Sequence, residues 1–238
     1  MKSEHGVALP AYRTLADRLR TEIVSGRLKP GERLPTEPQL CGSTGLSRST
    51  VREALRLLAS QHLITTVRGV TGGSFVTQPH PSLFAESLSN GLQFLMSCGP
   101  VDGHQVFEVR ELLEVPAAGL AARRADAEDI AVMRATFCDP ETADLDTLLA
   151  GSSLFHAAVA RACGNPVLQM VLEPLYSVGN QREIGARFPF DRWQRFDRDH
   201  REILAAIESR DVGAARGAAA AHLAALHETY ADVRYQPV

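Results

Sequence analysis

The stretch LPTEPQLCGSTGLSRSTVREALRLLASQHLI, residues Leu34–Ile64, decides the fold of the N-terminal third of the chain. It predicts two short helices joined by a tight turn. Thr36, followed three residues later by Gln39, has the spacing of a capping box at the start of the first helix. Gly45 can adopt the positive φ that such a turn needs, and Ser47 is a good N-cap for the second helix. The stretch therefore predicts a helix-turn-helix.

The second helix of this pair has an apolar face and an arginine face. The apolar positions, which predict the buried side, are Val51, Ala54, Leu55 and Leu58. The outward positions are Arg48, Arg52 and Arg56, with the hydroxyls of Ser49 and Thr50 near the front. Arginines and short hydroxyl side chains at the start of a helix suit recognition of a DNA major groove. An ordinary amphipathic helix with solvated arginines is the alternative that this helix alone leaves open.

The residues after this helix predict a β-hairpin. Leu63–Val67 is rich in β-branched residues, and Ser74–Val76 predicts the returning strand. Between them, the basic, glycine-rich tip Arg68–Gly73 contains Arg68 and Gly69 as candidate DNA contacts. A helix-turn-helix followed by such a hairpin is a winged helix. Double-stranded DNA is therefore the predicted partner.

The distribution of charge supports this prediction. The 238 residues have a net charge of only −3, which does not by itself indicate a nucleic-acid binder. Residues 1–78, however, hold 11 Lys and Arg against 6 Asp and Glu, a charge of +5, whereas the remaining 160 residues carry −8. A basic module joined to an acidic one is expected if only the first module meets phosphate.

The sequence predicts a cytoplasmic protein with no membrane contact. No apolar run approaches the roughly 18 residues of a transmembrane helix, and the N-terminus lacks the apolar core of a signal peptide. The four cysteines lie far apart, without the paired spacing of a disulfide framework or a cysteine zinc site, which fits a reducing compartment.

Breaks in the pattern divide the chain into an arm (1–10), a winged helix-turn-helix domain (11–78), a linker (79–81) and a second domain (82–238). We expect the first domain to have three helices, beginning with Tyr12–Ser25, and a β-hairpin wing. The sequence pattern of the second domain predicts an all-α bundle of six or seven helices. The protein is therefore expected to be mainly α. The predicted helices are Ser82–Met96, Gly103–Arg124, Ala127–Phe137, Asp144–Ala162, Pro166–Phe188, Arg192–Ser209 and Val212–Arg234.

Three histidines of the second domain are candidate metal ligands. His200 and His222 each lie 11 residues from Asp211, where the last two predicted helices meet, so an antiparallel pair places them at one height. With His156 from another helix, they could build a metal site inside the bundle. The spacings form no local motif, and by themselves they favour hydrogen-bonded core or interface histidines.

Arg110 is a candidate anion-binding residue. Val106, Val109 and Leu113 predict the buried face of its helix, and Arg110 lies at the edge of that face. A guanidinium group that points toward a core needs an anionic partner. That partner could be Glu114, one turn further along, or the carboxylate of a bound effector. The sequence leaves both open.

The chain resembles GntR-type transcription regulators of the FadR-like subfamily, whose C-terminal helical domain is known as the FCD domain. The resemblance covers nearly the whole chain after the first ten residues. It implies a homodimer that binds a DNA operator. We expect this homodimer to be a repressor that responds to a small organic acid. The stretches that carry it are YRTLADRLRTEIVSGRLKPGERLPTE, LSRSTVREALRLLASQHLI, VRGVTGGSFV, FEVRELLEVPAAGLAARRA, FHAAVARACGNPVL and DHREILAAIESRDVGAARGAAAAHL.

Residue by residue, the resemblance implies DNA contacts at the predicted positions. Arg48 and Arg52 fall on the family's base- and phosphate-contacting arginines, Ser49 and Thr50 on its short hydroxyls, and Arg68-Gly69 on its wing tip. Where the family usually has an arginine, this chain has Pro38. That change removes one expected DNA contact.

The resemblance also implies a divalent metal, with zinc as the first candidate. His156, His200 and His222 fall on three histidine ligands of the family, whereas the usual aspartate, four residues before the first histidine, is Ser152 here. Because a neutral serine is a poor ligand, the metal is held more weakly, is completed by water or an effector carboxylate, or is absent. The implied effector-binding residues are Arg110, Ser152, His156, His200 and His222.

A metal-dependent hydrolase is the alternative from another class, since three histidines with an open position can activate water. Against it, the sequence shows no well-placed carboxylate for a general base near His156, and an enzyme has little use for an arginine-striped helix and a wing. We therefore expect a regulator and not an enzyme.

Overall fold

The computed structural model describes residues 9–69, 72–99, 101–179 and 185–232. The chain forms two compact units, one ending at Leu83 and the other beginning at Phe84. Parts of four predicted features lie outside the described residues: residues 1–8 of the arm, 70–71 of the wing tip, 180–184 of the helix predicted over Pro166–Phe188, and 233–234 of the last helix. The four cysteines are free, and none of the described helices is long and apolar enough to cross a membrane.

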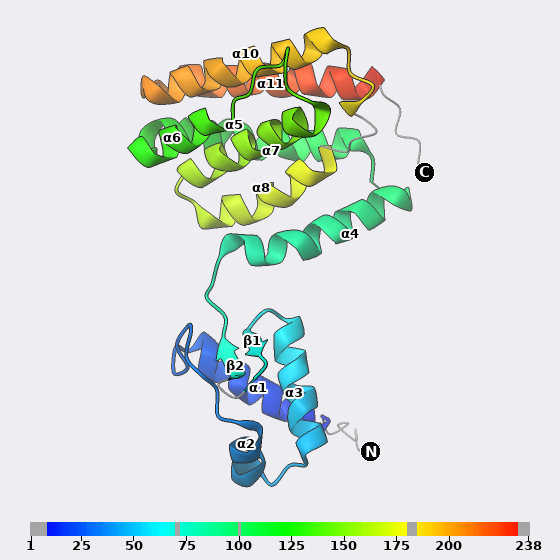
Figure 1. Cartoon of the computed structure of the whole chain (residues 1–238), viewed down its shortest axis with the longest axis vertical. Coiled ribbons are helices and arrows are strands. Elements are labelled where there is room, and N and C mark those ends of the chain that lie inside the picture. Colours follow the sequence, from blue (N-terminus) through cyan, green and yellow to red (C-terminus); the bar gives the residue numbers. More distant parts are fainter. Residues whose placement is uncertain (1–8, 70–71, 100, 180–184, 233–238) are drawn as a thin grey trace, which may run out of the picture. The chain divides into compact units, whose positions relative to one another are not determined.

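The first unit is the winged helix-turn-helix that the sequence predicts. Its helices are α1 (Ala11–Val24), α2 (Glu37–Thr44) and α3 (Arg48–Ser60), as Figure 1 shows. The strands β1 (Ile64–Val67) and β2 (Gly73–Val76) pair in antiparallel fashion, with Ile64 opposite Val76.

Local side chains define the two helices of the motif. The Gln39 side chain accepts a hydrogen bond from the Thr36 N–H at 2.8 Å, and the Ser47 hydroxyl accepts one from the Thr50 N–H at 3.2 Å. Gly45 has a φ of 70°, which ends α2 in the left-handed conformation. These features confirm the predicted caps and turn. The core below them includes Leu15, Leu19, Leu40, Val51, Ala54 and Leu58, all almost completely buried.

The segment before α2 supports the wing. The Leu34 N–H donates to the Ser74 carbonyl and the Val76 N–H to the Glu32 carbonyl, each at 2.8 Å. The Arg33 guanidinium donates to the Gly72 carbonyl and lies 6.0 Å from the centre of the Phe75 ring. The hairpin is thus anchored on its β2 side to the chain that leads into the helix-turn-helix.

The second unit is all-α in the described residues, as predicted. A 3-10 turn (Pro81–Phe84) precedes it. Helix α5 packs mainly against α11 and α7, α10 lies along α11, and α4 packs on α8 (Figure 1). The helices are α4 (Ala85–Ser97), α5 (Gly103–Arg124), α6 (Ala127–Ala135), α7 (Leu145–Ala162), α8 (Pro166–Gly179), α10 (Phe190–Glu208) and α11 (Val212–Asp232).

The prediction of one continuous helix over Pro166–Phe188 is wrong. Helix α8 is described to Gly179, residues 180–184 lie outside the described part, and the chain is in a turn at Arg187 before α10 begins. Pro189 disfavours a helical conformation at Phe188 and caps α10 with extended backbone, so the chain enters α10 as a separate helix. Phe188 packs with Trp193 and Phe196 of α10, whereas the buried residues Leu172, Leu175 and Tyr176 of α8 lie in a different cluster.

Candidate DNA-binding surface and buried histidine site

The predicted DNA contacts lie on the surface of the first unit. Arg48, Ser49, Arg52, Arg68 and Gly69 are exposed and Thr50 is half-buried. On α3 they stand opposite the residues that pack into the core. The structure therefore leaves the arginine face of α3 open to a partner.

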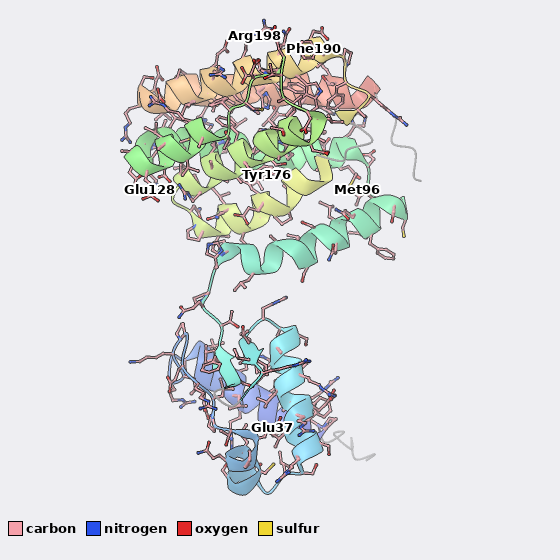
Figure 2. The ribbon with its side chains drawn as sticks, in the orientation of Figure 1. Glu37, Met96, Glu128, Tyr176, Phe190 and Arg198 are labelled. Carbon is pink, nitrogen blue, oxygen red and sulfur yellow. The ribbon has the colours of Figure 1, made fainter. Side chains whose placement is uncertain are left out.

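Arg52 is held by an ion pair on this surface. Its Nε donates to Glu37 at 2.9 Å, and its side chain remains 59% exposed. Figure 2 labels Glu37 at the start of α2, beside α3. Such exposed pairs contribute little stability, so Arg52 is oriented without being sequestered. Pro38 lies in the first turn of α2, where the missing N–H costs nothing.

The structure brings the three predicted histidines together inside the second unit. His156 comes from α7, His200 from α10 and His222 from α11, and the three residues are 7%, 5% and 1% exposed. Nε2 of His222 lies 3.3 Å from Nε2 of His156 and 3.1 Å from Nε2 of His200. Their equal spacing from Asp211 thus correctly predicts that His200 and His222 meet.

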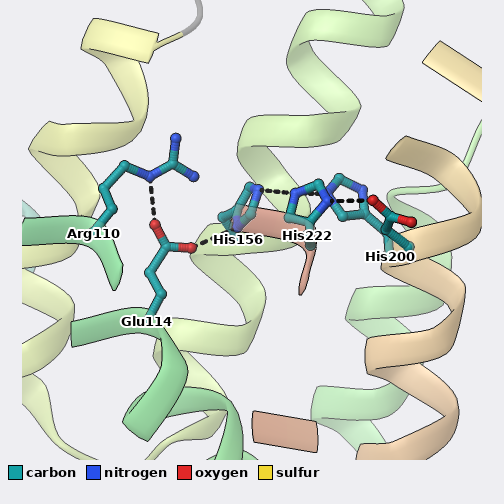
Figure 3. A network of polar contacts seen from close by, with 6 residues as sticks. Arg110, Glu114, His156, His200 and His222 are labelled. Carbon is teal, nitrogen blue, oxygen red and sulfur yellow. Dashed lines mark hydrogen bonds and ion pairs between the residues drawn. The ribbon is translucent and has the colours of Figure 1, made fainter. Parts of the chain in front are cut away.

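Two carboxylates extend this cluster into a polar row. Oε2 of Glu114, on α5, lies 2.7 Å from Nδ1 of His156, and its Oε1 accepts from Nε of Arg110 at 2.5 Å. Oδ2 of Asp199 lies 3.2 Å from Nδ1 of His222. Figure 3 shows the labelled side chains in a row from Arg110 through Glu114 and His156 to the other two histidines.

Burial and neighbouring charges shift the acidities in this row. Burial raises the pKa of Glu114, but the opposing effects of Arg110 and His156 outweigh it and bring the pKa to about 2. Burial lowers the pKa of His222 to about 4 even though Asp199 acts in the other direction. Burial, followed by the neighbouring histidines, also holds the pKa of His200 well below its ordinary value. Glu114 is thus ionised, and His200 and His222 are neutral, near pH 7.

The stability of the metal-free protein is expected to fall as the pH is lowered from 6.5 towards 2. Unfolding returns the pKa of His222 from about 4 to 6.5 and that of Glu114 from about 2 to 4.5. Within each window the unfolded state binds more protons, so acid favours unfolding, by roughly 3 kcal/mol per group at most. Urea unfolding with a chelator at successive pH values measures this. A midpoint that stays constant across both windows contradicts it.

The arrangement fits a divalent transition metal. When Glu114 and Asp199 accept the Nδ1–H groups of His156 and His222 and no proton sits on either Nε2, the two Nε2 lone pairs face each other across 3.3 Å. A cation between the rings relieves that repulsion. The spacing also matches the roughly 3.3 Å that separates nitrogens on tetrahedral zinc.

Aromatic rings and two small cavities surround the histidines. Phe155 stacks on His200 with centroids 4.4 Å apart, and Tyr176 stacks on His156 at 5.4 Å. A cavity of about 20 Å³ borders Glu114, His156 and His222, and one of about 30 Å³ borders Ser152 and His200. Each has room for about one water molecule. An organic acid therefore cannot enter either cavity without movement of side chains.

Two predictions about the surroundings of the site are wrong. Val109 is 40% exposed, because the inward face of α5 runs through Val106, Arg110 and Glu114 instead. The prediction that no well-placed carboxylate lies near His156 is also wrong, since Oε2 of Glu114 lies 2.7 Å from Nδ1 of His156. The sequence identified Glu114 only as a partner for Arg110, and it missed Asp199. No local signal shows which histidine a carboxylate on another helix will meet.

Comparison with known proteins follows the same division of the chain. Residues 11–76 match the family described as "Bacterial regulatory proteins, gntR family", and residues 105–225 match the FCD domain. The chain belongs to the GntR family. Its helical unit places it among the GntR regulators with an FCD domain, as the resemblance implies.

The GntR relatives match along most of the chain. A protein of Escherichia coli, named as a candidate regulator of the L-lactate dehydrogenase operon, is 30% identical over 220 residues, covering 90% of this chain and 84% of its own. The Glc operon transcriptional activator of the same organism is 28% identical and covers 95% and 91%. The structure of a Streptococcus agalactiae GntR protein has a TM-score of 0.61 at 26% identity, covering 91% and 99%.

The family and its relatives establish the class of protein. They are transcription regulators, so this chain is a DNA-binding transcription regulator of the GntR type and not an enzyme. The hydrolase alternative therefore has no support, even though a carboxylate does lie beside His156.

Proposed function

We propose that this regulator binds its operator as a cytoplasmic homodimer and acts as a repressor. Each protomer would present α3 to a major groove through Arg48, Ser49, Thr50 and Arg52, and the wing through Arg68-Gly69. The exposure of Arg48, Ser49, Arg52, Arg68 and Gly69 supports the proposal, as does the charge of +5 on residues 1–78. We place the DNA-binding domain at 11–78, after an arm (1–10), and the effector domain at 82–238, after a linker (79–81).

The helical domain would hold a divalent metal, with zinc first, through His156, His200 and His222. The convergence of their Nε2 atoms is the observation that carries this part of the proposal. The hydroxyl of Ser152 is a poor substitute for a carboxylate ligand. A coordination position is therefore left for water or for a carboxylate supplied by the effector. A bound metal would supply a positive charge able to attract that carboxylate.

The effector would be a small organic acid that contacts Arg110, Ser152 and the three histidines. Arg110 is a buried cation whose guanidinium carbon lies 5.3 Å from the centre of the Phe107 ring and 5.4 Å from that of the Tyr176 ring. The name of the L-lactate dehydrogenase operon relative is consistent with a carboxylate signal. Because both cavities are small, effector binding requires side chains to move. An effector that binds the opened arrangement more tightly than the closed one would shift DNA affinity.

Binding to DNA from upstream of the protein's own gene tests the proposal. Affinity measured over a salt series should fall steeply with salt, because each phosphate contact releases a counterion. Zinc together with L-lactate, as a probe acid, should then change that affinity. Salt-insensitive binding would contradict the assigned DNA surface. Unchanged affinity in the presence of zinc and a panel of small carboxylates would contradict the effector site.

A further inference from the structure

We propose that Glu114 and Asp199 are positioning residues that orient two of the three histidines for metal binding. The proposal deepens the metal site described above and rests on it. Each carboxylate faces the Nδ1 atom of a ring whose Nε2 points to the centre of the cluster. Neither residue is among the histidines and the serine that the family pattern identifies.

The tautomer of each histidine decides which of its ring nitrogens can bind a metal. A neutral imidazole carries one N–H, and the partner of that N–H decides which nitrogen is left with a free lone pair. Glu114 accepts from Nδ1 of His156 and Asp199 from Nδ1 of His222, at 2.7 and 3.2 Å. Both rings therefore turn a free Nε2 inward. Carboxylates in this position also make the ligating nitrogen more basic.

The two carboxylates fix the rings across different pairs of helices. Glu114 on α5 holds His156 of α7, and Asp199 on α10 holds His222 of α11. His200 is oriented differently, by stacking on the ring of Phe155. The metal geometry is thus set by helix packing and not by spacing along one helix.

Arg110 makes a carboxylate necessary at Glu114. Both Glu114 oxygens are occupied, one by Arg110 Nε and the other by His156 Nδ1, and the side chains of all three residues are at most 8% exposed. A glutamine offers one acceptor oxygen where two donors converge. Glu114→Gln is therefore expected to leave either Arg110 or His156 without its hydrogen bond.

The wild-type protein alone provides the first test. In metal-free, histidine-¹⁵N-labelled protein near pH 8, nitrogen chemical shifts report which ring nitrogen carries the proton. His156 and His222 should each be protonated at Nδ1. Protonation of either ring at Nε2 alone overturns the proposal for that histidine, and this measurement does not depend on a variant that folds.

Zinc affinity of matched variants provides the second test. Glu114→Gln and Asp199→Asn should each weaken zinc binding by about 10–100-fold. Glu111→Gln on α5 and Glu202→Gln on α10 should bind as the wild type does, because both side chains are exposed and lie outside the row. Folded Glu114→Gln and Asp199→Asn proteins with wild-type zinc affinity overturn the proposal.

His156→Ala separates failure of the positioning role from failure of the metal site. If this variant loses zinc binding while Glu114→Gln and Asp199→Asn retain it, the site is real but the carboxylates do not position it. If His156→Ala binds zinc as the wild type does, the three-histidine site itself is wrong.

Discussion

His200→Ala is expected to lower zinc affinity by at least about 100-fold. The variant leaves two imidazoles where three converge, and loss of an outer partner alone commonly costs about 10–100-fold. His200 is 5% exposed and its Nε2 lies 3.1 Å from that of His222. The change in operator affinity caused by zinc plus L-lactate should become smaller as well. Metal-free operator binding should change much less, because the DNA contacts lie in the other unit.

Isothermal titration with zinc and gel-shift measurements on the same preparations check this expectation. His104→Ala is the matched control, because His104 is an exposed histidine that pairs with His227 at 2.6 Å, outside the three-histidine cluster. Equal losses of operator binding and effector response in His200→Ala would show that the histidine is structural. Wild-type zinc affinity in His200→Ala would show that His200 is not a metal ligand.

Arg52→Ala is expected to weaken operator binding by at least about 10-fold while leaving the protein folded. An arginine that contacts a base or phosphate is typically worth about 1–3 kcal/mol. The side chain is 59% exposed and its ion pair with Glu37 lies on the surface, so little stability is lost with it. If Arg52 contacts phosphate, the number of counterions released on binding, measured from the slope of affinity against salt concentration, should also fall by about one.

Arg56→Ala provides the comparison on the same helix. Arg56 lies one turn further from the start of α3, its side chain is 77% exposed, and it pairs with Glu53. Because recognition helices contact bases mainly through their first turns, its loss should reduce affinity less than the loss of Arg52. Thermal melting checks whether both variants fold. Arg52→Ala with wild-type operator affinity would contradict the placement of α3 in the groove.

The first unit follows largely from local sequence. Caps at Thr36 and Ser47, the turn at Gly45 and the apolar face of α3 each depend on residues within about one helical turn. The β-hairpin was predicted from its β-branched strands and glycine-rich tip. The contact from Arg33 to the Gly72 carbonyl was not, because it joins residues that are distant in sequence.

The second unit shows where such reasoning stops. The equal spacing of His200 and His222 from Asp211 predicts that they meet. In an antiparallel helix pair, residues at equal distances from the connecting turn lie at the same level along the helices. The sequence was also interpreted as one helix over Pro166–Phe188, whereas the chain turns at Arg187 and Pro189 caps a new helix. A period shows which residues are buried and not where the chain turns.

The sequence by itself determined the winged helix, the arginine face and the helical bundle, and it singled out the three histidines as candidate ligands. Only the tertiary structure decided that one Glu114 carboxylate serves both Arg110 and His156, and that Asp199 faces His222. The physical reason is that a buried ion must find its partner among the helices packed around it. Which faces pack together depends on the fit of whole helices, which no short stretch of sequence encodes.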